Sequence, residues 1–233
     1  MFVTNVVLAN QILDRGFFHT LKDATYHAKE QTKEKIWKLP NNSVYFGDIE
    51  VRVYDTDDYR MNIFFLSLIP SEIAEMSCDQ HVVKIQLEIC QMLYTAWYFS
   101  NEEEYLQENA PFTKDGKRRG YRPAHRKHPM TMWVGSSLEN YMYACKIGMA
   151  LTFEYTRRYG KVHTCAEHLV WLMHHHPSHF EEHRSETAYY SVEGIPECMP
   201  EQYRSSSIID AYQMYYMMEK MSFARYKIPV DTK

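Results

Sequence analysis

One stretch, Cys78–Trp97, constrains the fold more than any other part of the chain. Placed at 100° per residue, five of its polar residues fall in one narrow arc of a helix, and apolar residues cover most of the remaining surface. The polar arc contains His81, Lys84, Glu88, Gln91 and Thr95. Because a helix that is apolar nearly all round is a buried one, the sequence predicts a mainly α-helical, compact domain around this central helix.

The ionisable part of the polar arc needs an explanation of its own. His81, Lys84 and Glu88 follow one another at intervals of one helical turn, so their side chains can touch. An unpaired buried charge is costly, so the arc must face a solvated cleft, a ligand or neutralising partners. Two interpretations stay open: a self-satisfied polar triplet in the core, and a binding or catalytic site.

Composition narrows the class of protein. The 233 residues include 19 Tyr, 11 Phe and 4 Trp but only 8 Gly, which favours a compact, mostly helical chain over a disordered one. The five cysteines are scattered without a CxxC pair, which indicates reduced thiols. We find neither a signal-peptide pattern nor an apolar run of membrane-spanning length. We therefore expect a soluble, intracellular protein of cytoplasm or nucleus, without a membrane partner.

The chain divides into unequal parts. Residues 1–60 predict a small α+β appendage of βαββ type, with a strand in FVTNVVL, a helix over Leu21–Leu39 and a hairpin formed by Ser43–Phe46 and Ile49–Tyr54. Residues 61–226 predict the helical domain, and residues 227–233 a tail. The composition leaves the oligomeric state open.

Further elements are expected within the helical domain. Asn62–Ile69 is an apolar run ended by Pro70, either a strand or an extended segment that threads the core. Ser136-Ser137-Leu138-Glu139 predicts a capping box for a helix over Leu138–Tyr159, which Gly160 ends. A helix capped at Thr164 and a last helix over Ile208–Phe223 follow, and residues 100–130 predict one long polar loop.

A basic segment lies within this loop. Between Lys114 and Lys127 there are seven basic residues against one acid, on a chain with a net charge of −4. Such a segment on an acidic body is typical of a loop that faces phosphates, although a solvated loop or pairing with Glu102–Glu104 explains it equally well. The candidate phosphate ligands here are Arg118, Arg119, Arg122, Arg126, Lys127 and His128.

Other chemistries leave no pattern in the chain. None of the twelve histidines forms an HExxH motif or a Glu-x-x-His repeat, so the sequence predicts no metal site. The chain also lacks a phosphate-binding P-loop, a dinucleotide fingerprint and a serine nucleophile elbow. We therefore expect no cofactor.

Four blocks of residues, in order, are similar to the pyrimidine-dimer DNA glycosylases, small all-α phage repair enzymes with bacterial relatives. Asp79-Gln80-His81 is followed by Glu88 at the distance at which that family carries its catalytic Glu. The other blocks resemble the family's apolar start, its His-Pro block and its Arg-Gly-Tyr block, and the resemblance covers about residues 61–165. They are Met61–Leu66, Gly120-Tyr121 with His128-Pro129, and Glu154–Gly160.

The resemblance implies an N-glycosylase that flips a damaged or modified pyrimidine out of DNA and cleaves its glycosidic bond through an imine, and it leaves abasic lyase activity open as a second activity. Glu88 is then the general acid/base, and His81 orients the extruded sugar or its phosphate. DNA is the implied partner. The basic segment between Lys114 and Lys127, called the basic loop below, is expected to bind phosphates together with Arg157 and Arg158. Tyr121 or Trp133 is expected to stack on a base.

Two departures from the family leave alternatives open. The family's nucleophile is an N-terminal amine, whereas the matching Met61-Asn62 lies inside this chain. Lys84 is our own candidate amine, provided that desolvation depresses its pKa. Family members are also basic overall, unlike this acidic chain. A non-catalytic nucleic-acid-binding module of the same fold, or an enzyme acting on free nucleotides, therefore stays possible.

Overall fold

The computed structural model describes residues 2–8, 11–18, 43–46, 49–55, 62–183 and 194–227. The chain divides into two compact units, Met1–Arg60 and Met61–Lys233.

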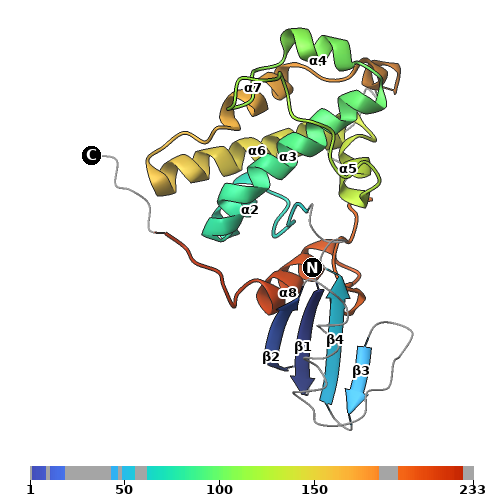
Figure 1. The fold of residues 1–233 in the computed structure, drawn as a ribbon, viewed down its shortest axis with the longest axis vertical. Helices are drawn as coiled ribbons and strands as arrows, with labels where there is room; N and C mark the ends of the chain where they lie inside the picture. Colours follow the sequence, from blue (N-terminus) through green and yellow to red (C-terminus); the bar gives the residue numbers. More distant parts are fainter. Residues whose placement is uncertain are drawn as a thin grey trace. The chain divides into compact units, whose positions relative to one another are not determined.

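The first unit contains a four-stranded sheet (Figure 1). Its strands are β1 (Phe2–Leu8), β2 (Gln11–Phe18), β3 (Ser43–Phe46) and β4 (Ile49–Asp55), in the spatial order β2-β1-β4-β3. All neighbours run antiparallel, and Val6 of β1 lies opposite Val51 of β4. Three of these strands coincide with the expected ones, whereas β2 was not predicted. The helix expected over Leu21–Leu39 lies outside the described residues.

The described part of the second unit is mostly helical, as predicted. Its α-helices are α2 (Pro70–Met76), α3 (Asp79–Phe99), α4 (Glu103–Asn109), α5 (Pro129–Val134), α6 (Leu138–Tyr159), α7 (Ala166–His174) and α8 (Ile208–Glu219). Two 3₁₀ turns, Ser178–His183 and Glu201–Tyr203, lie between α7 and α8 in the chain.

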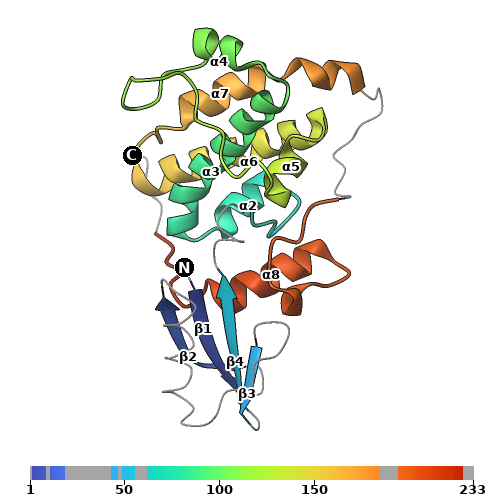
Figure 2. The same cartoon turned by 45° about the vertical axis from the view of Figure 1, so that its right-hand side comes forward.

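Helix α3 is the centre of this unit. It packs against α6 along its length and also contacts α4, α5 and α7, while α2 packs on α6 (Figure 2). Ile89, Leu93 and Trp97 of α3 are buried in the single apolar core that results. The prediction of a buried central helix is confirmed, since burial of its apolar side chains provides most of the driving force for a helix of this kind.

The segment that precedes α2 threads the core without becoming a strand. Residues 62–66 are buried, and the Gln213 Nε2 donates a hydrogen bond to the carbonyl of Leu66 at 2.8 Å. The hydroxyl of Tyr143 on α6 donates to the carbonyl of Leu68 at 2.6 Å. Side chains of α6 and α8 thus satisfy backbone groups that no neighbouring strand satisfies.

The stretch 100–130 differs from the expected single loop. It contains α4, anchored by the buried Leu106, and closes with the first residues of α5. Between these helices, Phe112 and Arg119 form an isolated antiparallel bridge. Helices of only seven and six residues leave little periodicity in a sequence, which explains why these were not predicted.

Two helix ends also differ in detail. Helix α6 is capped by Ser137, whose hydroxyl accepts from the Asn140 backbone N–H, so Glu139 occupies the second position and not the third. Helix α8 begins at Ile208 as expected, with Ser207 as its N-cap, but ends at Glu219 instead of Phe223. The end of α6 is as predicted, because Gly160 takes the left-handed conformation that suits glycine.

Candidate functional site

The carboxylate of Glu88 lies at the middle of the candidate site. The residue is only 5 % exposed, and burial raises the pKa of its carboxyl, while Lys84 partly opposes that rise. Both carboxylate oxygens have partners. Lys84 Nζ lies 2.9 Å from Oε1, and the backbone N–H of Asn62 donates to Oε2 at 3.2 Å. A carboxyl with a raised pKa is suited to general acid/base work near neutral pH.

Three hydrogen bonds, one from the backbone and two at the side chain, fix the position of Asn62. It is 2 % exposed, its Nδ2 donates to the Cys198 carbonyl at 2.8 Å, and its Oδ1 accepts from the Tyr212 hydroxyl at 3.1 Å. Cys198 lies before α8 and Tyr212 lies within it, so these two bonds attach the segment 62–66 to α8 and to the stretch that leads into it. As a result, the backbone nitrogen of Asn62 has a fixed position beside Glu88.

Lys84 does not meet the condition under which we proposed it as a nucleophile. Its side chain is 65 % exposed, so burial does not favour the neutral amine that attack on carbon requires. It lies beside the Glu88 carboxylate, which stabilises an ammonium. Lys84 therefore balances the buried carboxylate and reaches solvent at the same time.

His81 is buried one turn before Lys84 and is part of an aromatic cluster. Its ring stacks on Phe64 with centroids 4.6 Å apart, and its Nδ1 lies 2.7 Å from the Tyr216 hydroxyl. That hydroxyl also accepts from the backbone N–H of Cys78 at 2.8 Å. Burial, with the nearby charges of Lys220 and Lys84, lowers the pKa of His81 to about 3, so the ring is neutral at physiological pH. If Tyr216 donates its one proton to Nδ1, His81 keeps a hydrogen on Nε2 as a donor.

The polar arc of α3 also holds the end of the basic loop. The Thr95 hydroxyl accepts from the backbone N–H of Ala124 at 3.0 Å. The next residue, His125, is exposed and has a φ of 46°, in the left-handed region that few non-glycine residues adopt. Its charge acts on Glu88, whose pKa it lowers. The turn closes where the His128 backbone N–H donates to the His125 carbonyl at 2.9 Å.

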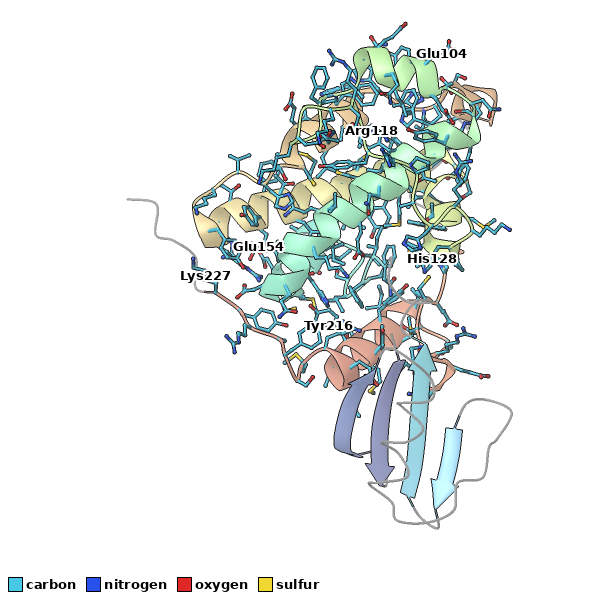
Figure 3. The ribbon with its side chains drawn as sticks, in the orientation of Figure 1. Glu104, Arg118, His128, Glu154, Tyr216 and Lys227 are labelled. Atoms are coloured by element: carbon cyan, nitrogen blue, oxygen red, sulfur yellow. The ribbon has the colours of Figure 1, made fainter. Side chains whose placement is uncertain are left out.

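Some of the basic side chains contact other parts of the protein, and others are exposed without such contacts in the described part of the chain. Arg118 donates to the Tyr98 hydroxyl at 2.9 Å and to the Gly120 carbonyl at 3.1 Å (labelled in Figure 3). Arg119 donates to the Ala110 carbonyl at 2.8 Å and covers the Phe112 ring. Arg126 is half exposed and lies 4.0 Å from Glu103, the acidic pairing that one interpretation expected. Arg122 and Lys127 are exposed, and no contact of their side chains appears in the described part of the chain.

Arg158 has a structural position. It is 2 % exposed and binds the carboxylates of Glu154 and Asp79 at 2.5 and 3.0 Å, together with the carbonyls of Ser77 and Glu75. The C-terminal residues up to Lys227 pass close to this end of α6 (Figure 3), since the Lys227 backbone N–H also donates to Asp79. A side chain enclosed in this way does not reach a phosphate.

Three further candidates have partners of their own. Arg157 forms a bidentate ion pair with Glu154 at 2.6 and 2.7 Å and is half exposed. Trp133 is buried and packs edge-on against Phe65, so it belongs to the core and is not a stacking platform. Tyr121 is partly buried against the ring of Tyr94, and its hydroxyl contacts the Cys165 thiol.

His128 acts as the N-cap of α5, because its Nδ1 accepts from the Met130 backbone N–H at 3.2 Å. The structure thus brings together Glu88, Lys84 and, one turn away, His81, and places the end of the basic loop along the same face of α3. It adds Asn62, His125 and Tyr216 to the site. Asn62 was within the quoted block Met61–Leu66, but its contact with Glu88 spans 26 residues and leaves no local pattern.

In the described ranges, three or more His, Cys, Asp or Glu side chains nowhere converge as a metal site would require. Within these same ranges, no helix combines the length and the apolar character needed to cross a membrane. The chain matches no family model, and neither a curated protein nor a solved structure is significantly similar to it.

Proposed function

We propose that the second unit is a DNA N-glycosylase that extrudes a damaged or modified pyrimidine and cleaves its glycosidic bond through an imine intermediate, with abasic lyase activity as a consequence. The observation that carries the proposal is the bond between the Asn62 backbone nitrogen and Glu88 Oε2. A buried carboxyl of raised pKa beside a fixed nitrogen is the pair of groups that imine chemistry at a sugar carbon needs.

The nucleophile follows from this pair. In the intact chain the Asn62 nitrogen is an amide and does not attack carbon. In a chain cleaved between Met61 and Asn62 the same nitrogen is an α-amine, with Glu88 in place to accept its proton. This arrangement is the equivalent of the N-terminal amine that the family resemblance implies. In the intact chain, Lys84 is the amine nearest to Glu88, at 2.9 Å.

Binding of DNA rests on the exposed cations around the site. Arg122, Lys127 and Lys84 are exposed, and Ala124, which lies between the first two in the chain, is hydrogen-bonded to Thr95 of α3. Exposed Lys and Arg side chains supply the counterion-release term that dominates affinity for a phosphate backbone. Arg118 and Arg119 hold the loop in shape instead.

The test is borohydride trapping on duplex DNA that contains either a thymine dimer or an abasic site. The full chain, a version beginning at Asn62 after removal of the initiating Met, and the Glu88→Gln variant of each are compared, with Glu139→Gln at the partly buried start of α6 as the matched control. We expect a covalent adduct from the version beginning at Asn62 and at least a hundredfold less from its Glu88→Gln variant.

The other outcomes decide between the alternatives. Salt-sensitive DNA binding without an adduct from either form would establish the non-catalytic binding module. Turnover of free nucleotides without affinity for DNA would establish the small-substrate enzyme. An adduct that Glu88→Gln leaves unchanged would contradict the assignment of Glu88.

A further inference from the structure

His125 is the residue of the site whose purpose neither the family resemblance nor the fold explains. It has a left-handed backbone conformation that costs a non-glycine residue about 1 kcal/mol or more. Such a conformation persists where the surroundings impose it. Here both ends of the turn are anchored, at Ala124 by Thr95 of α3 and at His128 by the start of α5.

These two anchors place the turn beside the reacting groups. Thr95 lies seven residues, or two turns, after Glu88 on the same face of α3. Helix α5 packs on α3 and, through the edge-on contact of Trp133 with Phe65, on the segment that begins with Asn62. The exposed imidazole of His125 thus belongs to a turn that α3 and α5 anchor, and it is near enough to Glu88 for its charge to lower the pKa of that carboxyl.

The proposed reaction lacks one proton donor. When an amine attacks C1′ of the sugar, it must lose a proton, and the departing pyrimidine must gain one. Glu88 is committed to the amine, since its Oε2 is bound to the Asn62 nitrogen and its Oε1 to Lys84. The Nδ1 of His81 is engaged with Tyr216 and that of His128 with the α5 backbone. Of the three histidines, only His125 is exposed, whereas His81 is buried and His128 is partly buried.

We propose that His125 is the general acid that protonates the departing base. This inference rests on the proposed function. In the step, the amine nitrogen forms a bond to C1′ and the bond from C1′ to N1 of the pyrimidine breaks. The electron pair of that bond goes to the base, which takes a proton from the imidazolium of His125, and the proton of the amine goes to Glu88.

The test uses His125→Asn, because asparagine is the side chain that best tolerates a left-handed backbone and lacks an acidic proton. The form of the protein that gives an adduct in the trapping experiment is assayed in single turnover on two duplexes, one with a thymine dimer and one with a preformed abasic site. His174→Asn, an exposed histidine at the end of α7, is the control.

We expect His125→Asn to slow base release from the dimer about a hundredfold and to change trapping at the abasic site less than about twofold, because the abasic sugar has no base to protonate. A similar loss on both duplexes would assign His125 a structural role and overturn the inference. An unchanged rate on the dimer would overturn it as well. Wild-type adduct at the abasic site alone would refute base protonation while leaving the lyase activity, and no adduct at all would refute the proposed function itself.

Discussion

At the scale of single residues, the site contains one buried acid and one buried base, and burial shifts their pKa values in opposite directions. Burial raises the pKa of Glu88 and lowers that of His81, because both side chains lose contact with water and their charged forms are disfavoured. The low pKa makes His81 a neutral ring that stacks on Phe64 and bonds to Tyr216. Its part in the site is to fix the start of α3, one turn from Lys84.

A pH dependence of stability follows for His81. The unfolded chain takes up a proton near pH 6.5, and the folded protein does so only near pH 3. Between these values the unfolded state binds more protons, so the contribution of His81 is fully present above pH 6.5 and is lost as the pH falls toward 3. The loss amounts to several kcal/mol at about 1.4 kcal/mol per pKa unit.

The variant His81→Phe keeps a ring against Phe64 and removes the titrating group. Urea unfolding at a series of pH values between 4 and 7 should give a flatter dependence for this variant than for the wild type. His174→Gln, which changes an exposed histidine, should keep the wild-type slope. Equal slopes for His81→Phe and wild type would show that another group dominates the acid response.

At the scale of elements, the basic loop is attached to α3 by hydrogen bonds. The loop is attached to α3 at Thr95 and through Arg118 to Tyr98, and it is attached to itself by the Phe112–Arg119 bridge. Arg118 and Arg119 thus build the loop, whereas Arg122 and Lys127 reach solvent. A count of charges in the sequence does not separate these two uses.

Two glycines of the loop offer a matched test of this attachment. Gly116 and Gly120 both have a φ in the left-handed region, at 67° and 63°. A Cβ on Gly120 would lie 2.8 Å from the buried Tyr94 ring, whereas one on Gly116 would meet open space. Alanine at either position should cost about 1 kcal/mol of unfolding free energy for the backbone. Gly120→Ala should lose roughly 1–3 kcal/mol more through the clash.

The two losses are measured by urea unfolding of the paired variants. Equal values would mean that Tyr94 moves freely and that the loop is not fixed to α3 at this point.

The exposed cations allow a second test at this scale. Arg122→Ala and Lys127→Ala should each reduce the slope of log K against log salt by about one for duplex DNA, because each removes one phosphate contact. Lys161→Ala removes an exposed cation after the end of α6 and should leave the slope unchanged. Fluorescence anisotropy at several salt concentrations gives the slopes. A uniform effect of all three variants would indicate diffuse attraction instead of a defined surface.

At the scale of the whole molecule, the sequence predicted those features of the helical unit that depend on residues close together in the chain. The periodicity of 79–99 and the Ser137 and Gly160 ends of α6 are features of neighbouring residues. The contacts that complete the site are not. Asn62 meets Glu88 across 26 residues, and Tyr216 meets His81 across 135. No periodicity encodes such pairings, so the sequence suggested Glu88 and His81 and missed their partners.

The same distinction between local patterns and distant contacts explains why the sequence did not reveal the burial of Arg158 and Trp133. Each is the residue type expected at a DNA surface, and each is buried because carboxylates or aromatic rings from distant segments surround it. The resemblance to glycosylases suggested Arg158 from its position in the order of the matching blocks, and that position carries no information on whether the side chain is buried. For Glu88, the position in the blocks and the burial of the side chain both point to the candidate site.

The most direct measurement is to identify the atom that holds the sugar. A chain beginning at Asn62 is trapped with borohydride on abasic duplex DNA, digested, and analysed by mass spectrometry for the peptide that carries the deoxyribose remnant. The account predicts that the modification lies on the α-amine of Asn62. A modification on Lys84, or the absence of any adduct, would contradict the claim that Asn62 and Glu88 form the reacting pair.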